Sequence, residues 1–221
     1  MPGRTVERPR RHTASAPRAP YHHGDLKNAL IRAGAEILAQ EGVPGLTLRR
    51  AAQRAGVSHS APYAHFADKQ ALIAAISTEG VRRVRARIAE ASARHADDPR
   101  RRLVETAVET VRFALEQPDL YRVTFSNAIG READYPDYVT AAHDGFAELV
   151  EVVRACQAEG VLARGPAEPL AIELWGLVHG VVSLVLNGQV PQRVLARTSP
   201  RALVLRALAA RLAPPRRRIR P

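Results

Sequence analysis

The sequence predicts an all-α fold of about nine helices, and two patterns lead to this prediction. Apolar residues recur at three- and four-residue spacing along most of the chain, which is the period of one helix face. Runs in which apolar and polar residues alternate, as in half-buried strands, are essentially absent. With 221 residues, 46% of them hydrophobic, the chain is long enough to bury a real core.

The first predicted helix covers residues 25–41, and Gly42 follows it as a residue suited to the left-handed conformation that often ends helices. A short second helix is expected over 48–55, with Thr47 as its N-cap. The residues before these helices form a different kind of segment. Residues 1–20 hold four prolines and five arginines but almost nothing apolar, so we expect a disordered basic arm.

The remaining helices follow from apolar stripes and from start and stop signals. A long helix is expected from 68 to about 95, and Asp98-Pro99 then supplies an N-cap with proline at the first helical position. The helix that begins there is expected to stop before Pro118. Further helices are predicted over 120–128, 146–158, 170–186 and 202–212, with a polar loop over 130–137.

Positive charge is concentrated at the two ends of the chain. The formal net charge is +11, with 11 basic against 6 acidic side chains in residues 1–80 and four arginines in the short tail 214–221. Residues 81–213 carry 18 basic against 16 acidic side chains. Clustered positive charge favours a polyanionic partner, although basic ends that only aid solubility are an equally good reading of the charge alone.

The segment 46–66 has the layout of a helix-turn-helix. Gly56 can supply the positive φ of the turn, and Val57 can fill the angle between the two helices. A second helix is expected to begin at His59 with Ser58 as N-cap, which places Pro62 at the fourth helical position. This geometry lays the second helix in the major groove of DNA, although a helical hairpin of any all-α protein is the plainer alternative.

The same residues resemble the DNA-binding signature of the tetracycline-repressor (TetR) family. The resemblance lies in "LTLRRAAQRAGVSHSAPYAHFADKQAL", residues 46–72, and in the helix that precedes it. It implies a helix-turn-helix domain over 21–80 and a ligand-binding and dimerisation domain over 81–213. It also implies a homodimer, joined through the last two helices, that reads a palindromic operator and is released by a small-molecule effector. A transcriptional activator of the same family and a non-specific nucleoid-type binder are the alternatives.

The resemblance also implies a role for individual residues. Thr47 would touch the DNA backbone, and His59 and Ser60 would probe base edges. The DNA-binding set as a whole is Thr47, Ser58, His59, Ser60, Pro62, Tyr63, His65 and Lys69, in which Tyr63, His65 and Lys69 would hold phosphates. Many members of the family carry Arg where this chain has Ala64, and the basic arm could compensate by entering the adjacent minor groove.

The C-terminal half contains "LWGLVHG", residues 174–180, which resembles the Trp-x-x-x-His-Gly motif of one TetR subgroup (WHG). Trp175 and His179 stand one turn apart on one helix face, and Gly176 and Gly180 allow close approach of another helix. Trp175 and His179 have two possible roles. The structural one is packing in a core or dimer interface, and the functional one is lining an effector pocket. The pocket candidates are Phe113, Tyr121, Phe125, His143, Phe146, Trp175 and His179. Few acidic pairs face inward in this half, so an apolar or weakly polar effector is expected and not a strongly cationic one.

Other classes of protein find little support in the sequence. No nucleophile elbow, phosphate-binding glycine loop or His-Glu-x-x-His zinc motif occurs, so we expect neither an enzyme nor a metal or cofactor site. The single Cys156 excludes an internal disulfide framework. No stretch resembles a signal peptide or has the length of uninterrupted apolar residues that a membrane helix needs, so a cytoplasmic location without membrane partners is expected.

Overall fold

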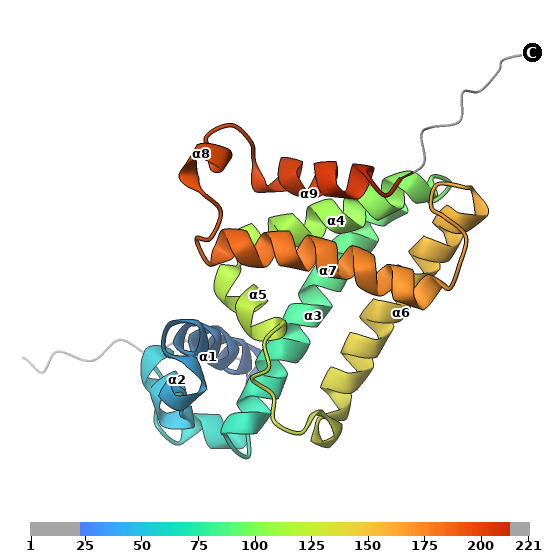
Figure 1. The fold of residues 1–221 in the computed structure, drawn as a ribbon. Helices are drawn as coiled ribbons and strands as arrows, with labels where there is room; N and C mark the ends of the chain where they lie inside the picture. Colours follow the sequence, from blue (N-terminus) through green and yellow to red (C-terminus); the bar gives the residue numbers. More distant parts are fainter. Residues whose placement is uncertain (1–22, 213–221) are drawn as a thin grey trace, which may run out of the picture.

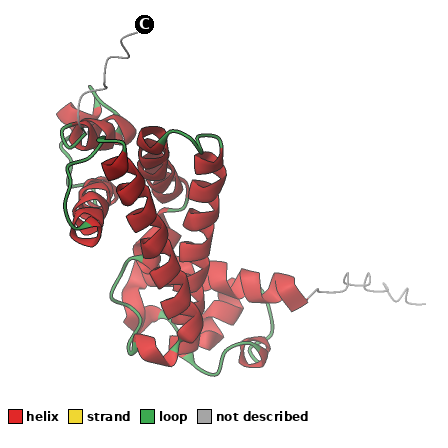
Figure 2. Ribbon diagram, turned by 90° about the vertical axis from the view of Figure 1, so that its right-hand side faces the viewer, coloured by secondary structure: helices red, strands yellow, loops and turns green. Residues whose placement is uncertain are grey.

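The computed structural model describes residues 23–212, and every regular element within that range is a helix (Figures 1 and 2). The all-α prediction is therefore confirmed. The elements are α1 (His23–Gly45), α2 (Leu48–Arg54), η1 (Ala61–Ala64), α3 (Lys69–Ala93), α4 (Pro99–Glu116), α5 (Pro118–Thr124), η2 (Glu132–Asp134), α6 (Pro136–Ala158), α7 (Ala167–Leu186), α8 (Gln192–Leu195) and α9 (Pro200–Ala209). The predicted arm over 1–20 and the basic tail over 214–221 lie outside the described residues.

The predicted starts of two long helices are confirmed by their capping hydrogen bonds. The Asp68 carboxylate accepts from the Ala71 amide at 2.8 Å and begins α3. The Asp98 carboxylate accepts from the Arg101 amide at 2.9 Å, with Pro99 as the first residue of α4. Each cap satisfies an amide that has no partner within its own helix.

Two expected helix starts were wrong, and the helices predicted over 120–128 and 202–212 end earlier, at Thr124 and Ala209. Ser58 does not cap a helix, because residues 58–60 form a turn and η1 begins only after Ser60. Pro62 is therefore the second residue of a 3-10 turn, where its missing N–H forfeits no helical bond. Helix α6 begins at Pro136, ten residues before the predicted start. The prediction missed its first turns because they pack through small residues such as the buried Ala141. Small residues do not stand out as an apolar stripe.

Helix α3 is the central element of the fold. It packs against α1 at its beginning and against α4, α5 and α6 along its length, so it runs through both halves of the molecule (Figure 1). Helices α7 and α9 contact each other and α4 at the end remote from α2. One continuous cluster of buried apolar residues joins the two ends, from Leu30 in α1 to Leu208 in α9.

Candidate nucleic-acid interface and ligand cavity

The helix-turn-helix is held together by a small apolar core under α2. Leu48, Ala51 and Ala52 are buried, and Leu46 beside them is fully buried. Gly56 has a φ of 69°, and the next amide, that of Val57, donates to the carbonyl of Ala52 at 3.0 Å. The predicted turn is therefore present, because only a glycine adopts this φ without strain.

Five of the eight predicted DNA-binding residues are exposed on one stretch of this unit. Thr47, Ser58, His59, Ser60 and Tyr63 all face solvent, and the Tyr63 side chain is 63% exposed. Thr47 has a structural task as well, since its hydroxyl caps α2 by accepting from the Arg50 amide at 3.1 Å. The hydroxyls of Ser58 and Ser60 lie 3.2 Å apart, which keeps the turn before η1 compact.

The other three predicted residues are less accessible. Pro62 is the buried residue of η1, so its ring is not presented to solvent on this surface. His65 is half-buried and its Nε2 is a buried atom without a hydrogen-bond partner, so a phosphate contact would have to use Nδ1. Lys69 donates to the Val43 carbonyl at 3.4 Å and keeps two further N–H bonds for another acceptor.

A clamp between α1 and α2 was missed from the sequence. The guanidinium of Arg50 holds the Glu41 carboxylate through two bonds of 2.5 and 2.6 Å, and it also donates to the Gly45 carbonyl at 2.6 Å. The hydrogen bond from Arg50 lowers the pKa of Glu41 below its usual value. Arg50 therefore orients α2 and is not a free cation for DNA. Nothing in the residue spacing signals this, because α1 departs from helical geometry at Gly42 between the partners.

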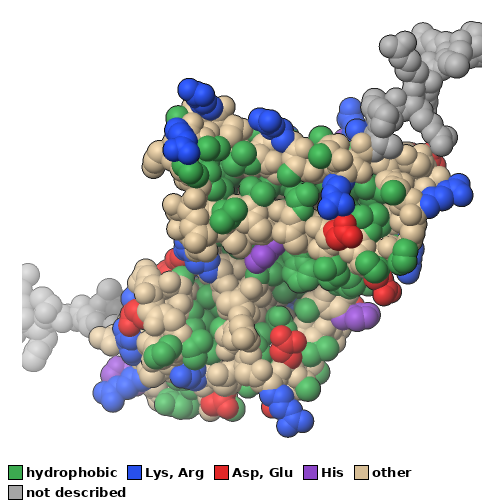
Figure 3. Space-filling view, viewed as in Figure 1, with side chains coloured by type: hydrophobic (Ala, Val, Ile, Leu, Met, Phe, Trp, Pro, Cys, Tyr) green, Lys and Arg blue, Asp and Glu red, His purple; other side chains and the backbone are tan. Residues whose placement is uncertain are grey.

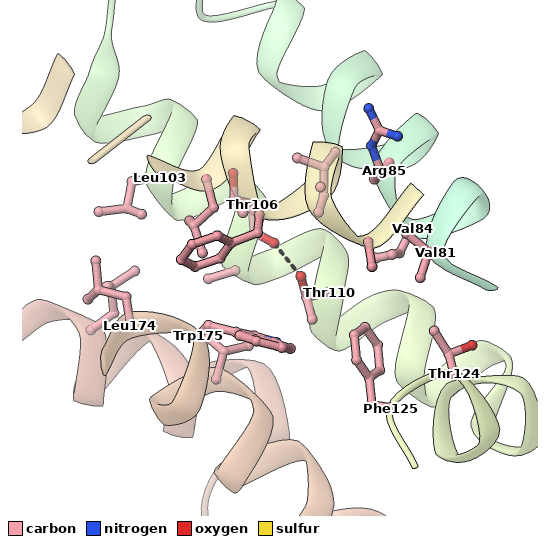
Figure 4. Close-up of a pocket in the computed structure, with 18 of the residues that line it drawn as sticks. Val81, Val84, Arg85, Leu103, Thr106, Thr110, Thr124, Phe125, Leu174 and Trp175 are labelled. Atoms are coloured by element: carbon pink, nitrogen blue, oxygen red, sulfur yellow. Dashed lines mark hydrogen bonds between the residues drawn. The ribbon is translucent and has the colours of Figure 1, made fainter. Parts of the chain in front are cut away.

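A cavity of about 180 Å³ lies between α3, α4, α6 and α7, and Thr124 of α5 and Leu208 of α9 also line it (Figure 4). Among the predicted pocket residues, Phe125, Phe146 and Trp175 line it. Phe113 and Tyr121 are buried in the core, His143 is exposed, and His179 lies beside the cavity without lining it. Three of the seven candidates therefore line this cavity: Phe125 directly after α5, Phe146 on α6 and Trp175 on α7.

Several lining residues were not anticipated. Tyr138 lies in the early part of α6, which the predicted helix left out, and Thr106 and Thr110 look like polar surface residues in sequence. The two threonines could have been identified from the sequence, because their four-residue spacing places them on the same helix face as Leu103 and Ala107, which also line the cavity.

His179 is held by two hydrogen bonds inside the protein. Its Nδ1 lies 2.9 Å from the Tyr121 hydroxyl, and its Nε2 lies 3.3 Å from the Ser183 hydroxyl. Burial lowers the pKa of His179 and raises the pKa of Tyr121 far above its ordinary value. A neutral ring that donates with one nitrogen and accepts with the other matches this pair of hydroxyls. The structure thus supports the internal packing role for His179.

Helix α7 exposes apolar side chains along its outer face. Ile172 and Leu184 on this face are 50 and 47% exposed, and nothing lies within 4 Å of the place where a Cβ of Gly176 or Gly180 would stand. Trp175, which is 41% exposed, lies on the cavity side of the helix. Hydrophobic atoms gather over α7 on the face seen in Figure 3. By length and composition alone α7 is long and apolar enough to cross a membrane, but a helix of a packed core meets the same criteria, and α7 packs here on α4, α6 and α9. Within residues 23–212, no three His, Cys, Asp or Glu side chains form a metal-binding group.

Comparison with known proteins agrees with this geometry. The family description "Bacterial regulatory proteins, tetR family" matches residues 30–76, and "Tetracyclin repressor-like, C-terminal domain" matches residues 103–211. No curated protein sequence matches the chain.

Solved structures cover most of the chain. A protein of unknown function from Rhodococcus sp. RHA1 is 32% identical over 86% of this chain and 95% of its own, with a TM-score of 0.70. A bacterial regulatory protein in the tetR family from Rhodococcus RHA1 is 22% identical over 84% and 94%, with a TM-score of 0.62. The TetR family transcriptional regulator PfmR from Thermus thermophilus is 17% identical over 80% and 97%, with a TM-score of 0.64.

An exposed helix-turn-helix on an all-helical body with its own cavity defines a DNA-binding transcriptional regulator. The chain belongs to the tetracycline-repressor (TetR) family. Fold and family point to regulation and not to enzymatic catalysis.

Proposed function

We propose that the protein is a homodimeric repressor that binds a palindromic operator and is released from it by a small, largely apolar effector. The observation that carries this proposal is the path of α3. The helix begins beside the helix-turn-helix and, further along, contributes Val81, Val84 and Ile88 to the cavity wall. One rigid element therefore contacts both the DNA-reading unit and the effector space.

The exposed side chains of Ser58, His59, Ser60 and Tyr63 support the proposed DNA contact. His59 and Ser60 would reach base edges, whereas Thr47, Tyr63, His65 and Lys69 would hold phosphates. Ala64 is exposed and offers no charge to a phosphate at this point of the surface. The arm before residue 20 would supply the missing cations from the minor groove.

The outer face of α7 supports the proposed dimer. Gly176 and Gly180 leave its backbone open to close approach, and Ile172 and Leu184 extend the same face on either side. Helix α9 lies alongside, joined to α7 by an ion pair of 3.0 Å between Arg211 and Glu173. Packing two copies through α7 and α9 would remove this apolar surface from water, which gives α7 a role that needs no membrane.

Helix α5 supports a route for the signal besides α3. It contacts α1 of the DNA-reading unit, and it ends at Thr124 and Phe125 in the cavity wall. An effector that shifts α3 and α5 would change the separation of the two recognition elements in the dimer. Affinity for half-sites about 34–36 Å apart would then fall.

The "LWGLVHG" segment supports membership of the WHG subgroup, with Trp175 in the cavity wall and His179 behind it. A soluble cytoplasmic regulator is the setting in which such a protein would meet chromosomal DNA. We propose both on the basis of family membership.

The test is binding of the full-length protein to the DNA upstream of its own gene and to random DNA of equal length, with the molecular mass measured by sedimentation. A repressor binds its upstream DNA at least about a thousandfold more tightly than random DNA. Equal affinity for the two would support the nucleoid-type alternative. Transcription from that promoter in a purified system distinguishes a repressor, which lowers it, from an activator, which raises it.

The contribution of the arm has a separate test. Deletion of residues 1–18 should weaken operator binding and reduce the slope of affinity against salt, because fewer phosphates are neutralised. An unchanged affinity and slope would refute a role for the arm.

A further inference from the structure

The lining of the cavity identifies the class of molecule that fits it, and this inference rests on the proposed function because it concerns the proposed effector site. Apolar side chains form most of the wall, and four aromatic rings line it, those of Phe125, Tyr138, Phe146 and Trp175. Phe125 and Trp175 meet edge to face with their ring centres 6.2 Å apart. A wall of this kind favours hydrocarbon, because burying apolar area is its main source of binding free energy.

Arg85 is the one charged side chain in the described lining, and it is already neutralised. Its guanidinium lies 2.6 Å from a carboxylate oxygen of Glu148 and 3.4 Å from one of Asp144. One cation thus faces two carboxylates, and the three groups together carry a net charge of −1. Figure 4 shows the guanidinium directed away from the rings of Phe125 and Trp175. A ligand carboxylate would find no unpaired cation in the wall, and burying it without a partner is strongly unfavourable.

A positively charged ligand is also disfavoured in this cavity. The carboxylates of Asp144 and Glu148 are about half exposed, are not among the lining residues and hold Arg85. An ammonium group would have to displace that arginine or remain in the apolar space without a counterion. Either alternative costs more free energy than the new contacts of the ammonium group contribute.

The threonines of the wall present hydrogen-bond acceptors. The Thr110 hydroxyl donates to the Thr106 carbonyl at 2.8 Å (Figure 4). The Thr106 hydroxyl donates to the Arg102 carbonyl at 2.9 Å. The Thr124 hydroxyl likewise donates to the Leu120 carbonyl at 2.7 Å. Each hydroxyl hydrogen is therefore used within its own helix, while the oxygen lone pairs stay free to accept.

We propose that the cavity binds an uncharged, mainly hydrocarbon molecule with one hydroxyl group, which donates to a threonine oxygen of α4. The hydrocarbon part lies against Phe125, Phe146 and Trp175. Carboxylates and amines of the same skeleton are discriminated against, since neither finds a counterion in the wall.

Trp175 makes this proposal directly measurable, because it is the single tryptophan of the chain and lines the cavity. Three probes with the same carbon chain are 1-octanol, octanoate and octylammonium, each titrated at about pH 7.5 into the full-length protein while Trp175 fluorescence is recorded. We expect a saturable change with 1-octanol at a concentration at least tenfold lower than for either ion. An ion that binds as tightly as 1-octanol would overturn the proposal.

The hydroxyl contact is tested by Thr110→Val, which preserves shape and removes the acceptor. The variant should bind 1-octanol about three- to tenfold more weakly, as expected for one neutral hydrogen bond. The matched control is Thr140→Val on the exposed side of α6, which should bind it like the unchanged protein. Equal affinity of Thr110→Val and Thr140→Val for 1-octanol would overturn the assigned contact.

A DNA-binding measurement distinguishes a failure of this inference from a failure of the proposed function. The same titrations are repeated with the upstream DNA fragment bound, and fluorescence anisotropy of labelled DNA is followed. Saturable 1-octanol binding without any change in DNA affinity supports the ligand class and refutes the effector role of the cavity. Release of DNA by octanoate at lower concentration than by 1-octanol supports the effector role and refutes the ligand class.

Discussion

The hydroxyl of Tyr121 on α5 lies 2.9 Å from Nδ1 of His179 on α7, and the two rings stack with centres 5.7 Å apart. This pair joins the short helix that contacts α1 of the DNA-reading unit to the helix that lines the cavity and carries the exposed apolar face. Any movement of α7 relative to α5 must break or carry along this contact. The pair is therefore a structural link between the two functional regions.

The buried setting of His179 predicts that acid destabilises the protein. Burial lowers the pKa of His179 in the folded state below that of the unfolded chain, about 6.5. Its contribution to stability is therefore fully present above about pH 6.5 and is lost as pH falls through the folded-state pKa. Urea unfolding at about pH 7.5 and 5.5 measures this loss. His179→Gln should lose less unfolding free energy between these pH values than the unchanged protein. The exposed His143→Gln is the control and should lose as much as the unchanged protein. Equal losses in all three proteins would contradict the prediction.

Gly80→Ala should destabilise the fold by about 1–3 kcal/mol through overpacking. A Cβ on Gly80 would lie 1.8 Å from Oγ1 and 2.9 Å from Cβ of Thr124, so α3 and α5 would have to separate. The matched control is Gly145→Ala, whose Cβ would lie 3.2 Å from the flexible side chain of Arg85. Thermal or urea unfolding compares the two. A Gly80→Ala protein as stable as Gly145→Ala would show that the helices are not held at this distance.

Substitutions in the recognition segment should separate base contacts from phosphate contacts. Tyr63→Ala should weaken binding to operator and random DNA alike, by about 1–3 kcal/mol, and lower the salt slope only slightly since tyrosine is uncharged. His59→Ala should weaken operator binding and also relax base preference at one operator position. Binding to a set of operators with single base-pair changes is the measurement. Identical preference profiles for the two variants would refute the proposed division of roles.

Gly176→Leu should disrupt the proposed dimer without unfolding the protomer. In the single chain a Cβ at this site would have no atom within 4 Å, whereas a leucine side chain would separate two helices packed on this face. Sedimentation should show a monomer with an unchanged helical spectrum and weakened operator binding. Ala89→Leu, at an exposed position on α3, is the control and should remain dimeric. A dimeric Gly176→Leu protein would place the interface elsewhere.

Much of the local structure could be predicted from the chain alone because it depends on neighbouring residues. The caps at Thr47, Asp68 and Asp98 and the turn at Gly56 each act within a few positions, so residue type and spacing determine them. The exposed row around His59 and Tyr63 follows from the same local pattern. The start of α6 was predicted wrongly because the buried face of its first turns is made of small residues.

The sequence by itself thus determined the fold class, the family resemblance and the helix-turn-helix as a unit. Only the tertiary structure decided which side chains meet across helices: Arg50 with Glu41, Tyr121 with His179, and the threonines of α4 with the rings of α5, α6 and α7. Helical periodicity says which face of a helix is buried but not which helix covers it. For that reason Phe113 and Phe125 look alike in sequence, and only the packing of α5 against α3, α4 and α7 places the first in the core and the second in the cavity wall.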